Sequence, residues 1–219
     1  MKFILYGTEI SPPVRSVLLC LKALGLECEL RNIDLLAKEH LKEEFIRKNP
    51  QHTIPVLEIE DGKYIWDSHA INCYLVNRYA KNDSLYPKDH YLHAIVDQRL
   101  HFDSGVLFPA LRSINYPLFY HNEHEVPEWK YDCIREAYLF CEKFLEHYNY
   151  FCGNTLTIAD FHFLATITSL EAYIPVHGDQ YPRLFAWLKR MQVLPYYNEV
   201  NGLPVHKFIE LVHQKLRGH

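Results

Sequence analysis

The chain has 219 residues, of which 48% are hydrophobic and 14% are aromatic. This apolar content suffices for one large domain or two smaller ones, and it excludes a disordered chain. With 23 basic and 27 acidic residues, the formal net charge is -4. No basic surface is therefore expected, which argues against nucleic acid or an anionic membrane as a partner.

The cysteines and the opening segment indicate a reducing compartment. The six cysteines form no C-x-x-C pair, so we expect them to be reduced and mostly buried. The segment MKFILYG is too short for the apolar core of a signal peptide, and no stretch reaches the ~18 to 20 apolar residues of a membrane span. We expect a cytoplasmic protein. The fourteen histidines lack carboxylate or cysteine partners at ligand spacing, so no metal site is expected.

The first eighty residues alternate between strand-like and helical segments. A buried strand, KFILY, is followed by a helix that ends at Gly25. Two β runs meet at Asp61-Gly62, a dipeptide typical of tight hairpin turns, and Asp67 or Ser68 begins another helix. A second strand is expected at 28–35 and a short charged helix at 41–47. The order β-α-β-α-β-β-α predicts a mixed sheet with helices packed on it.

The remainder of the chain reads as helical. We expect an N-terminal α/β domain at 1–80, a linker at 81–90 and an all-helical domain at 91–219. Pro109 lies inside a long amphipathic segment and should bend it. Thr157 and Asp160 have the spacing of a capping box before an apolar run, and we assign Asp160 a folding role.

The segment Ser11-Pro12-Pro13-Val14-Arg15 allows two interpretations. Proline suits the first turn of a helix, and a serine just before it can cap that helix. Alternatively, Ser11 lies where the positive end of the helix holds an external anion. The five residues alone favour the first interpretation.

Six motifs in order resemble the cytosolic glutathione transferases. They are SPPVR, NPQHTIPVL, WDSHAI, LYPKD and LTIAD, preceded by the N-terminal strand. Within that family the chain resembles the insect delta and epsilon classes, and the runs LHFDSGVLF and LPYYNEVNG favour epsilon. The resemblance implies a thioredoxin-like domain followed by a helical-bundle domain, a homodimer, and glutathione as co-substrate without a metal.

The reaction implied is addition of the glutathione sulfur to an electrophile, which requires a thiolate near neutral pH. The resemblance gives Ser11 the role of donating a hydrogen bond to that sulfur. A tyrosine has this role in other classes, so Tyr6 is an alternative, although the SPPVR context favours Ser11 and a core position for Tyr6.

The resemblance also implies the sites for both substrates. Asp67 would bind the γ-glutamyl ammonium, although its position also suits a plain helix cap, and Ser68 would bind the γ-glutamyl carboxylate. His69 replaces an arginine common in the delta class. Ile54-Pro55 resembles a cis-proline segment. The expected glutathione site is His40, His52, Thr53, Ile54, Pro55, Asp67, Ser68 and His69. The expected apolar pocket is Ile10, Leu35, Phe108, Leu111, Arg112, Asn115, Phe119 and Phe208, some of which should be core instead.

Three function classes remain. The first is a detoxifying transferase that acts on apolar electrophiles, including insecticides and peroxides. The second is a carrier of steroids or other hydrophobic ligands, and the third is a structural module on the same fold. The complete set of glutathione-site residues favours the enzyme. Arg112 either polarises an electrophile, steadies the glutathione or is a solvated helix charge.

Overall fold

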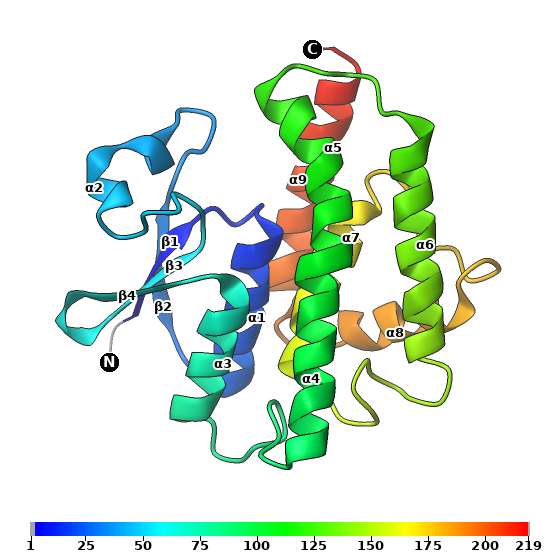
Figure 1. Cartoon of the computed structure of the whole chain (residues 1–219), viewed down its shortest axis with the longest axis horizontal. Coiled ribbons are helices and arrows are strands. Elements are labelled where there is room, and N and C mark those ends of the chain that lie inside the picture. Colours follow the sequence, from blue (N-terminus) through cyan, green and yellow to red (C-terminus); the bar gives the residue numbers. More distant parts are fainter. Residues whose placement is uncertain (1–2, 219) are drawn as a thin grey trace.

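A four-stranded mixed sheet forms the N-terminal part of the protein (Figure 1). The structure, a computed structural model, describes residues 3–218, so Lys2 of the expected first strand and the domain end at His219 lie outside it. The strands are β1 (Phe3–Gly7), β2 (Cys28–Asn32), β3 (Val56–Ile59) and β4 (Lys63–Trp66), in the order β2-β1-β3-β4. β1 is parallel to β2 and antiparallel to β3. The expected hairpin joins β3 to β4, but Ile59 pairs with Lys63, so its turn has three residues instead of two.

Helices cover both faces of this sheet. They are α1 (Pro12–Leu24), α2 (Glu43–Ile46) and α3 (Ser68–Tyr79). Leu5 of β1 packs into the core with α1 and α3, whereas Tyr6, the next residue, packs with Phe45 of α2 on the other face. The Tyr6 hydroxyl donates to Glu58, and burial together with this bond raises the pKa of Tyr6 to about 12. Tyr6 is a core residue, as predicted.

The C-terminal part is a bundle of helices around α7, whose thirteen residues are all buried. The helices are α4 (His90–Phe102), α5 (Phe108–Tyr120), α6 (Glu128–Phe144), α7 (Ile158–Leu170), α8 (Pro182–Gln192) and α9 (Leu203–Leu216). The predicted capping box begins α7, and the buried Asp160 also accepts a hydrogen bond from Trp187 Nε1 at 3.0 Å. No described helix is both long and apolar enough to cross a membrane.

The predicted bend in the long helix is a π-helical turn. Residues Asp103–Leu107 form this turn between α4 and α5, and Pro109 follows in the first turn of α5. Proline lacks an N–H and clashes with the preceding turn, and the wider turn accommodates both effects. Beyond this turn, α5 continues the column begun by α4 and lies toward the end of the molecule at which α1 begins (Figure 1).

A buried arginine joins the two parts of the molecule. Arg15 of α1 donates to Asn201 Oδ1 at 2.6 Å and to the Ala165 carbonyl at 3.1 Å, and it also bonds Thr168 and Ser169. Burial lowers the pKa of this guanidinium to about 9. The bonds fix α1 against α7, and with it the position of the residues that precede α1.

Candidate active site

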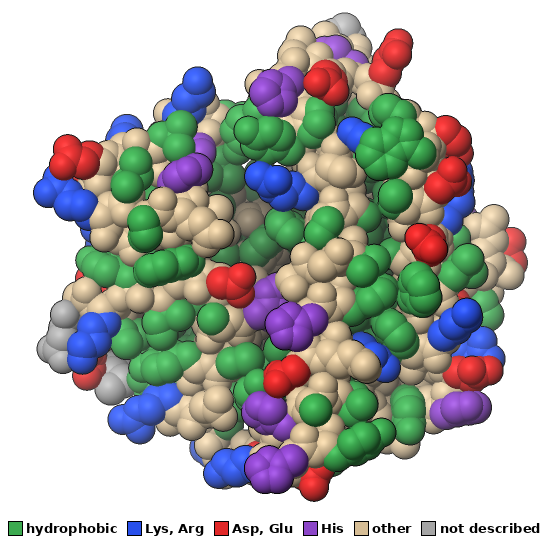
Figure 2. Space-filling view, viewed as in Figure 1, with side chains coloured by type: hydrophobic (Ala, Val, Ile, Leu, Met, Phe, Trp, Pro, Cys, Tyr) green, Lys and Arg blue, Asp and Glu red, His purple; other side chains and the backbone are tan. Residues whose placement is uncertain are grey.

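A cavity of about 980 Å³ lies between the sheet domain and the helical bundle. In the space-filling view it appears as a hollow with hydrophobic walls and with histidine and cationic side chains near its rim (Figure 2). All but one of the predicted site residues line it: Ile10, Ser11, Leu35, His40, His52, Thr53, Ile54, Pro55, Asp67, Ser68, His69, Phe108, Arg112, Asn115, Phe119 and Phe208. The exception is Leu111, which is fully buried in the hydrophobic core. The prediction for Leu111 is wrong because a helix turns about 100° per residue, so Arg112 faces the cavity while its neighbour faces the bundle.

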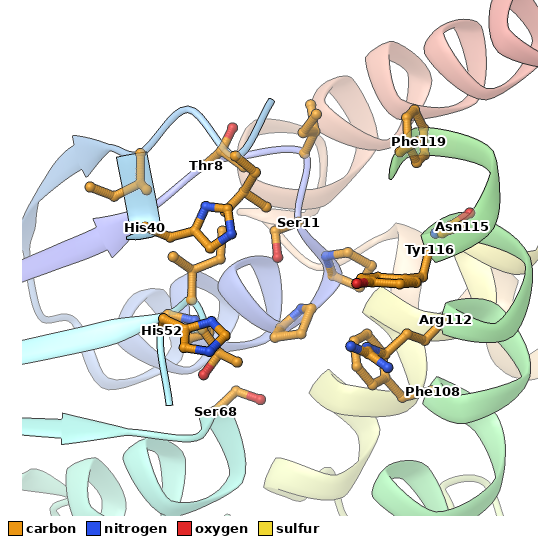
Figure 3. A pocket seen from close by; sticks show the side chains of 18 of the residues that line it. Thr8, Ser11, His40, His52, Ser68, Phe108, Arg112, Asn115, Tyr116 and Phe119 are labelled. Carbon is orange, nitrogen blue, oxygen red and sulfur yellow. The ribbon is translucent and has the colours of Figure 1, made fainter. Parts of the chain in front are cut away.

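Ser11 precedes α1 without capping it through its side chain. Its backbone is extended, with φ -75° and ψ 124°, and its carbonyl accepts the N–H of Arg15 at 3.0 Å. Within residues 3–218, its hydroxyl makes no cap hydrogen bond, so the capping interpretation of the serine is wrong. Figure 3 shows the hydroxyl directed into the cavity.

The prolines limit what the first turn of α1 can offer an anion. The first helical residues normally present free N–H groups, but Pro12 and Pro13 have none. The Arg15 N–H is bonded to the Ser11 carbonyl, and Val14, the other residue of this turn, is fully buried and does not line the cavity. A ligand anion at this end of α1 therefore depends on the Ser11 hydroxyl.

A buried asparagine shapes the loop before β3. Asn49 donates from Nδ2 to the Thr53 carbonyl at 2.8 Å and to Thr53 Oγ1 at 3.1 Å. The Ile54-Pro55 bond that follows is cis, as the resemblance implied. His52 has a positive φ of 46°. Asn49 thus holds the loop that lines the cavity beside Ser11.

Two histidines form the wall next to this loop. The rings of His40 and His52 lie 6.3 Å apart, centroid to centroid, and both line the cavity. The Nδ1 atom of His40 is buried without a hydrogen-bond partner in the described structure. Burial and the nearby His52 lower the pKa of His40. His40 thus places a buried ring nitrogen without a hydrogen-bond partner beside the cavity, which is uncommon for a buried polar atom.

Asp67 caps α3 and still has a free oxygen. Its Oδ1 accepts the N–H groups of His69 at 2.9 Å and of Ala70 at 3.2 Å. Its φ is 69°, an uncommon value outside glycine that is frequent at functional sites. In the described structure, the hydrogen bonds of Asp67 all use Oδ1, which leaves Oδ2 to accept from a ligand. Ser68, next to it, is buried at the N-terminus of α3.

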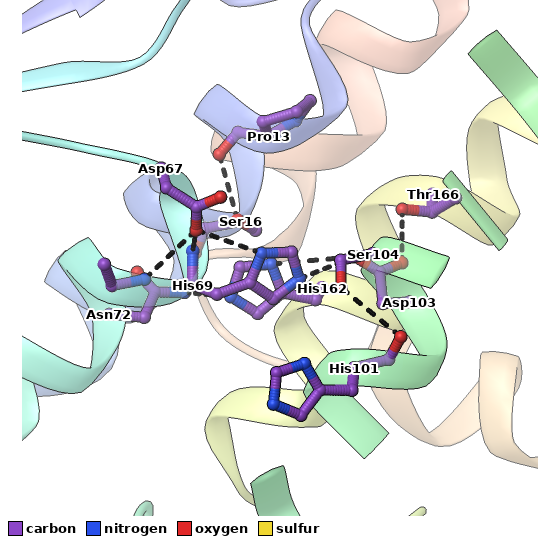
Figure 4. A network of polar contacts seen from close by, with 11 residues as sticks. Pro13, Ser16, Asp67, His69, Asn72, His101, Asp103, Ser104, His162 and Thr166 are labelled. Atoms are coloured by element: carbon purple, nitrogen blue, oxygen red, sulfur yellow. Dashed lines mark hydrogen bonds and ion pairs between the residues drawn. The ribbon is translucent and has the colours of Figure 1, made fainter. Parts of the chain in front are cut away.

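His69 links this cap to the helical bundle (Figure 4). Its Nδ1 lies 3.3 Å from Asp67 Oδ1, and its Nε2 lies 3.0 Å from Asp103 Oδ2. Burial alone would lower the pKa of His69, but its bonds to Asp103 and Asp67 outweigh burial and raise the pKa to about 9. The His69 bond, despite burial, lowers the pKa of Asp67 to about 2. At neutral pH, an imidazolium therefore joins two carboxylates from different domains.

A second ring completes the network. His162 of α7 stacks on His69 with ring centroids 3.9 Å apart, and burial lowers its pKa well below the usual value. Asn72 Nδ2 lies 3.0 Å from His162 Nε2, so that nitrogen is an acceptor, and Thr166 donates to Asp103. His69, Asp103 and His162 form a group of metal-type ligands in the described structure. Hydrogen bonds occupy both nitrogens of His69 and Nε2 of His162.

The opposite wall of the cavity is one face of α5. Figure 3 shows Phe108, Arg112, Asn115 and Tyr116 facing Ser11 across the space. The Arg112 guanidinium lies over the Tyr116 ring, 4.9 Å from its centroid. This wall is mostly aromatic, as expected for the site of an apolar substrate.

Two family models match the chain: the N-terminal domain of glutathione S-transferases over residues 5–83, and their C-terminal domain over residues 96–195. The chain belongs to the glutathione S-transferase family. An epsilon-class glutathione S-transferase from housefly, Musca domestica, is 50% identical, with a TM-score of 0.95 over 97% of this chain and 98% of that one. A glutathione transferase homologue from Drosophila mojavensis, solved with bound glutathione, is 48% identical, with a TM-score of 0.95 over 98% of this chain and 97% of the other. Glutathione S-transferase 1 of Manduca sexta is 42% identical over 92% of this chain and 93% of its own length.

These comparisons confirm the family, the two-part fold and the similarity to the epsilon class. The sequence analysis of this transferase did not identify several residues of the site. Tyr116 and Tyr120 line the cavity, four and eight residues after Arg112, so helical spacing could have indicated them. Asp103 and His162 carried no such signal, because their partners are 34 to 90 residues away along the chain. Asn49 bonds Thr53, only four residues further on, and was missed although its partner is local.

Proposed function

We propose that this glutathione transferase conjugates the glutathione thiolate to apolar electrophiles, with the Ser11 hydroxyl donating a hydrogen bond to the sulfur. The observation that carries this proposal is the position of Ser11. Its hydroxyl is not used as a cap, and it faces a cavity whose opposite wall is aromatic.

The energy required is within reach of these groups. A thiol has a pKa of ~8.5, and lowering it by about two requires ~2.7 kcal/mol of preferential binding to the anion. A hydrogen bond to a charged group contributes ~1.5–3 kcal/mol and a helix N-terminus ~0.3–1 kcal/mol. The Ser11 hydroxyl and the α1 dipole together span the required free energy.

The rest of the tripeptide fits the other walls. Asp67 Oδ2 would accept from the γ-glutamyl ammonium, and Ser68 at the N-terminus of α3 would bind its carboxylate. The backbone of Ile54 would pair with the cysteinyl unit. His52 and the unpartnered Nδ1 of His40 would meet the glycyl carboxylate.

The physiological role proposed is detoxification in the cytosol by a homodimer, with insecticide dehydrochlorination or peroxide reduction as further reactions. All six cysteines are free, as suits a reducing compartment.

Large apolar side chains are exposed on α4 and the π-helical turn, including Tyr91 at 73%, Leu92 and Val106. A second copy packed there would bury them. Light scattering on the purified chain tests this, and a monomer would contradict the homodimer.

The decisive experiment compares Ser11→Ala with a matched control, Ser113→Ala, which lies on α5 outside the cavity lining. We expect Ser11→Ala to bind glutathione within a few fold of wild type and to lower kcat/KM for 1-chloro-2,4-dinitrobenzene about 100-fold. That loss corresponds to ~2.7 kcal/mol. The pH midpoint of kcat/KM should rise toward that of the free thiol. An unchanged pH profile would remove Ser11 from the mechanism, and tight binding without turnover in wild type would favour the carrier instead.

A further inference from the structure

The α5 wall of the cavity offers a cation that the protein itself does not neutralise. Arg112 lines the cavity, and its partners among the described residues are aromatic: the guanidinium lies over the Tyr116 ring and interacts electrostatically with Tyr120. No carboxylate of residues 3–218 lies within ion-pair distance of it. Of the acidic side chains that line the cavity, Asp67 and Asp103 are bonded to His69, and Asp34 accepts the N–H of Ala37. The cation is therefore available to a ligand.

A second donor lies one turn further along the same helix face. Asn115 is three residues after Arg112, so both side chains point to the cavity. The Tyr173 hydroxyl donates to Asn115 Oδ1, which fixes the orientation of the amide. The Nδ2 group is thus the part of Asn115 left for a ligand. Arg112 and Asn115 together present N–H donors.

The surfaces beside these donors suit a flat molecule. Phe108 and Tyr116 flank Arg112 in Figure 3, on the side of the cavity that faces Ser11. Aromatic faces stack on planar conjugated rings, and a guanidinium binds a carboxylate through two parallel hydrogen bonds. A ligand that uses both features is planar at its centre and anionic at the end remote from Ser11.

We propose that the cavity is selective for planar conjugated electrophiles that carry a carboxylate, which Arg112 and Asn115 bind while the opposite carbon meets the glutathione sulfur. This inference rests on the function proposed above and names its substrate class. For an aryl chloride, the thiolate sulfur forms a bond to the ring carbon, and chloride leaves with the electron pair of the broken bond. The carboxylate is unchanged in the reaction and serves for recognition.

The test uses two aryl chlorides that differ in charge. In 4-chloro-3-nitrobenzoate the carboxylate lies para to the reacting carbon, and 4-chloro-3-nitrobenzamide is its neutral counterpart. We expect Arg112→Gln to lower the ratio of kcat/KM for the benzoate to that for the benzamide about tenfold, or ~1.4 kcal/mol. Arg112→Lys keeps the charge but not the bidentate geometry, so the ratio should fall only a few fold. Because each variant is compared between two substrates, differences in intrinsic reactivity and in folding cancel.

The matched control is Arg78→Gln. Arg78 also lies over a tyrosine ring, that of Tyr79, at 5.5 Å, but it is outside the cavity lining. This control should leave the ratio unchanged, and an equal fall would show a long-range charge effect and overturn the proposal. The proposal would also be overturned if Arg112→Gln had the same benzoate-to-benzamide ratio of kcat/KM as wild type. Wild-type turnover of neutral 1-chloro-2,4-dinitrobenzene reports on the proposed function separately, because that reaction needs no carboxylate.

Discussion

The imidazolium between Asp67 and Asp103 should make the stability of the protein depend on pH. The His69 side chain is 18% exposed and that of Asp103 is 4% exposed, so solvent screens their contact weakly. Burial opposes protonation of His69, but its two carboxylate bonds raise the pKa from 6.5 to about 9. Replacing this residue by glutamine removes the charge and keeps a side chain able to hydrogen bond.

The magnitude follows from the difference between the folded and unfolded pKa. A rise from 6.5 to about 9, at 1.36 kcal/mol per pH unit, corresponds to about 3 kcal/mol. Because the pKa is higher in the folded protein, this stabilisation is fully present below pH 6.5 and is lost as the pH rises through 9. The lowered pKa of Asp67 reflects the same contact seen from its partner, so the energy is counted once.

The assay is urea unfolding at pH 6 and pH 9.5, at one protein concentration, for wild type, His69→Gln and the exposed control His147→Gln. Between pH 6 and pH 9.5, the free energy of unfolding of wild type and of the control should each fall by about 3 kcal/mol more than that of His69→Gln. All three proteins have the same tyrosines and cysteines, so any contribution from the ionisation of these side chains cancels in the comparison. Equal losses in all three would refute a charged His69.

Two further substitutions separate folding roles from site roles. Asp160→Ala leaves several buried donors without an acceptor, so the free energy of unfolding should fall by ~3–5 kcal/mol. In the exposed control Asp179→Ala, the free energy of unfolding should fall by less than ~0.5 kcal/mol. Similar losses in both variants would contradict the role of Asp160 as a buried cap. Leu111→Ala should cost ~2–5 kcal/mol of stability because the residue is fully buried. If Leu111→Ala instead changes the substrate preference and leaves the free energy of unfolding unchanged, Leu111 lines the cavity and its assignment to the core is wrong.

Local chemistry is what the sequence predicted well. Proline fixes φ, so Pro12 and Pro13 specify where α1 begins, and Gly25 ends it in the left-handed conformation at φ 67°. The capping box at Thr157 and Asp160 starts α7 as expected. These signals are reliable because each depends on residues within one or two turns of chain. The family motifs then gave the fold and the residues that line the cavity.

Only the tertiary structure decided how distant side chains meet. His69, Asp103 and His162 come from three segments, and their charge states depend on burial and contact that no spacing encodes. The five residues around Ser11 favoured a helix cap and the family resemblance favoured a hydroxyl that meets the ligand; in the fold, that hydroxyl makes no cap hydrogen bond and Ser11 lines the cavity. The rotation of α5 about its own axis decided which of the pocket residues named from the sequence reach the cavity: Arg112 lines it, whereas Leu111 is buried in the core. Sequence specifies the elements through short-range forces, whereas the site depends on long-range packing that only the folded chain creates.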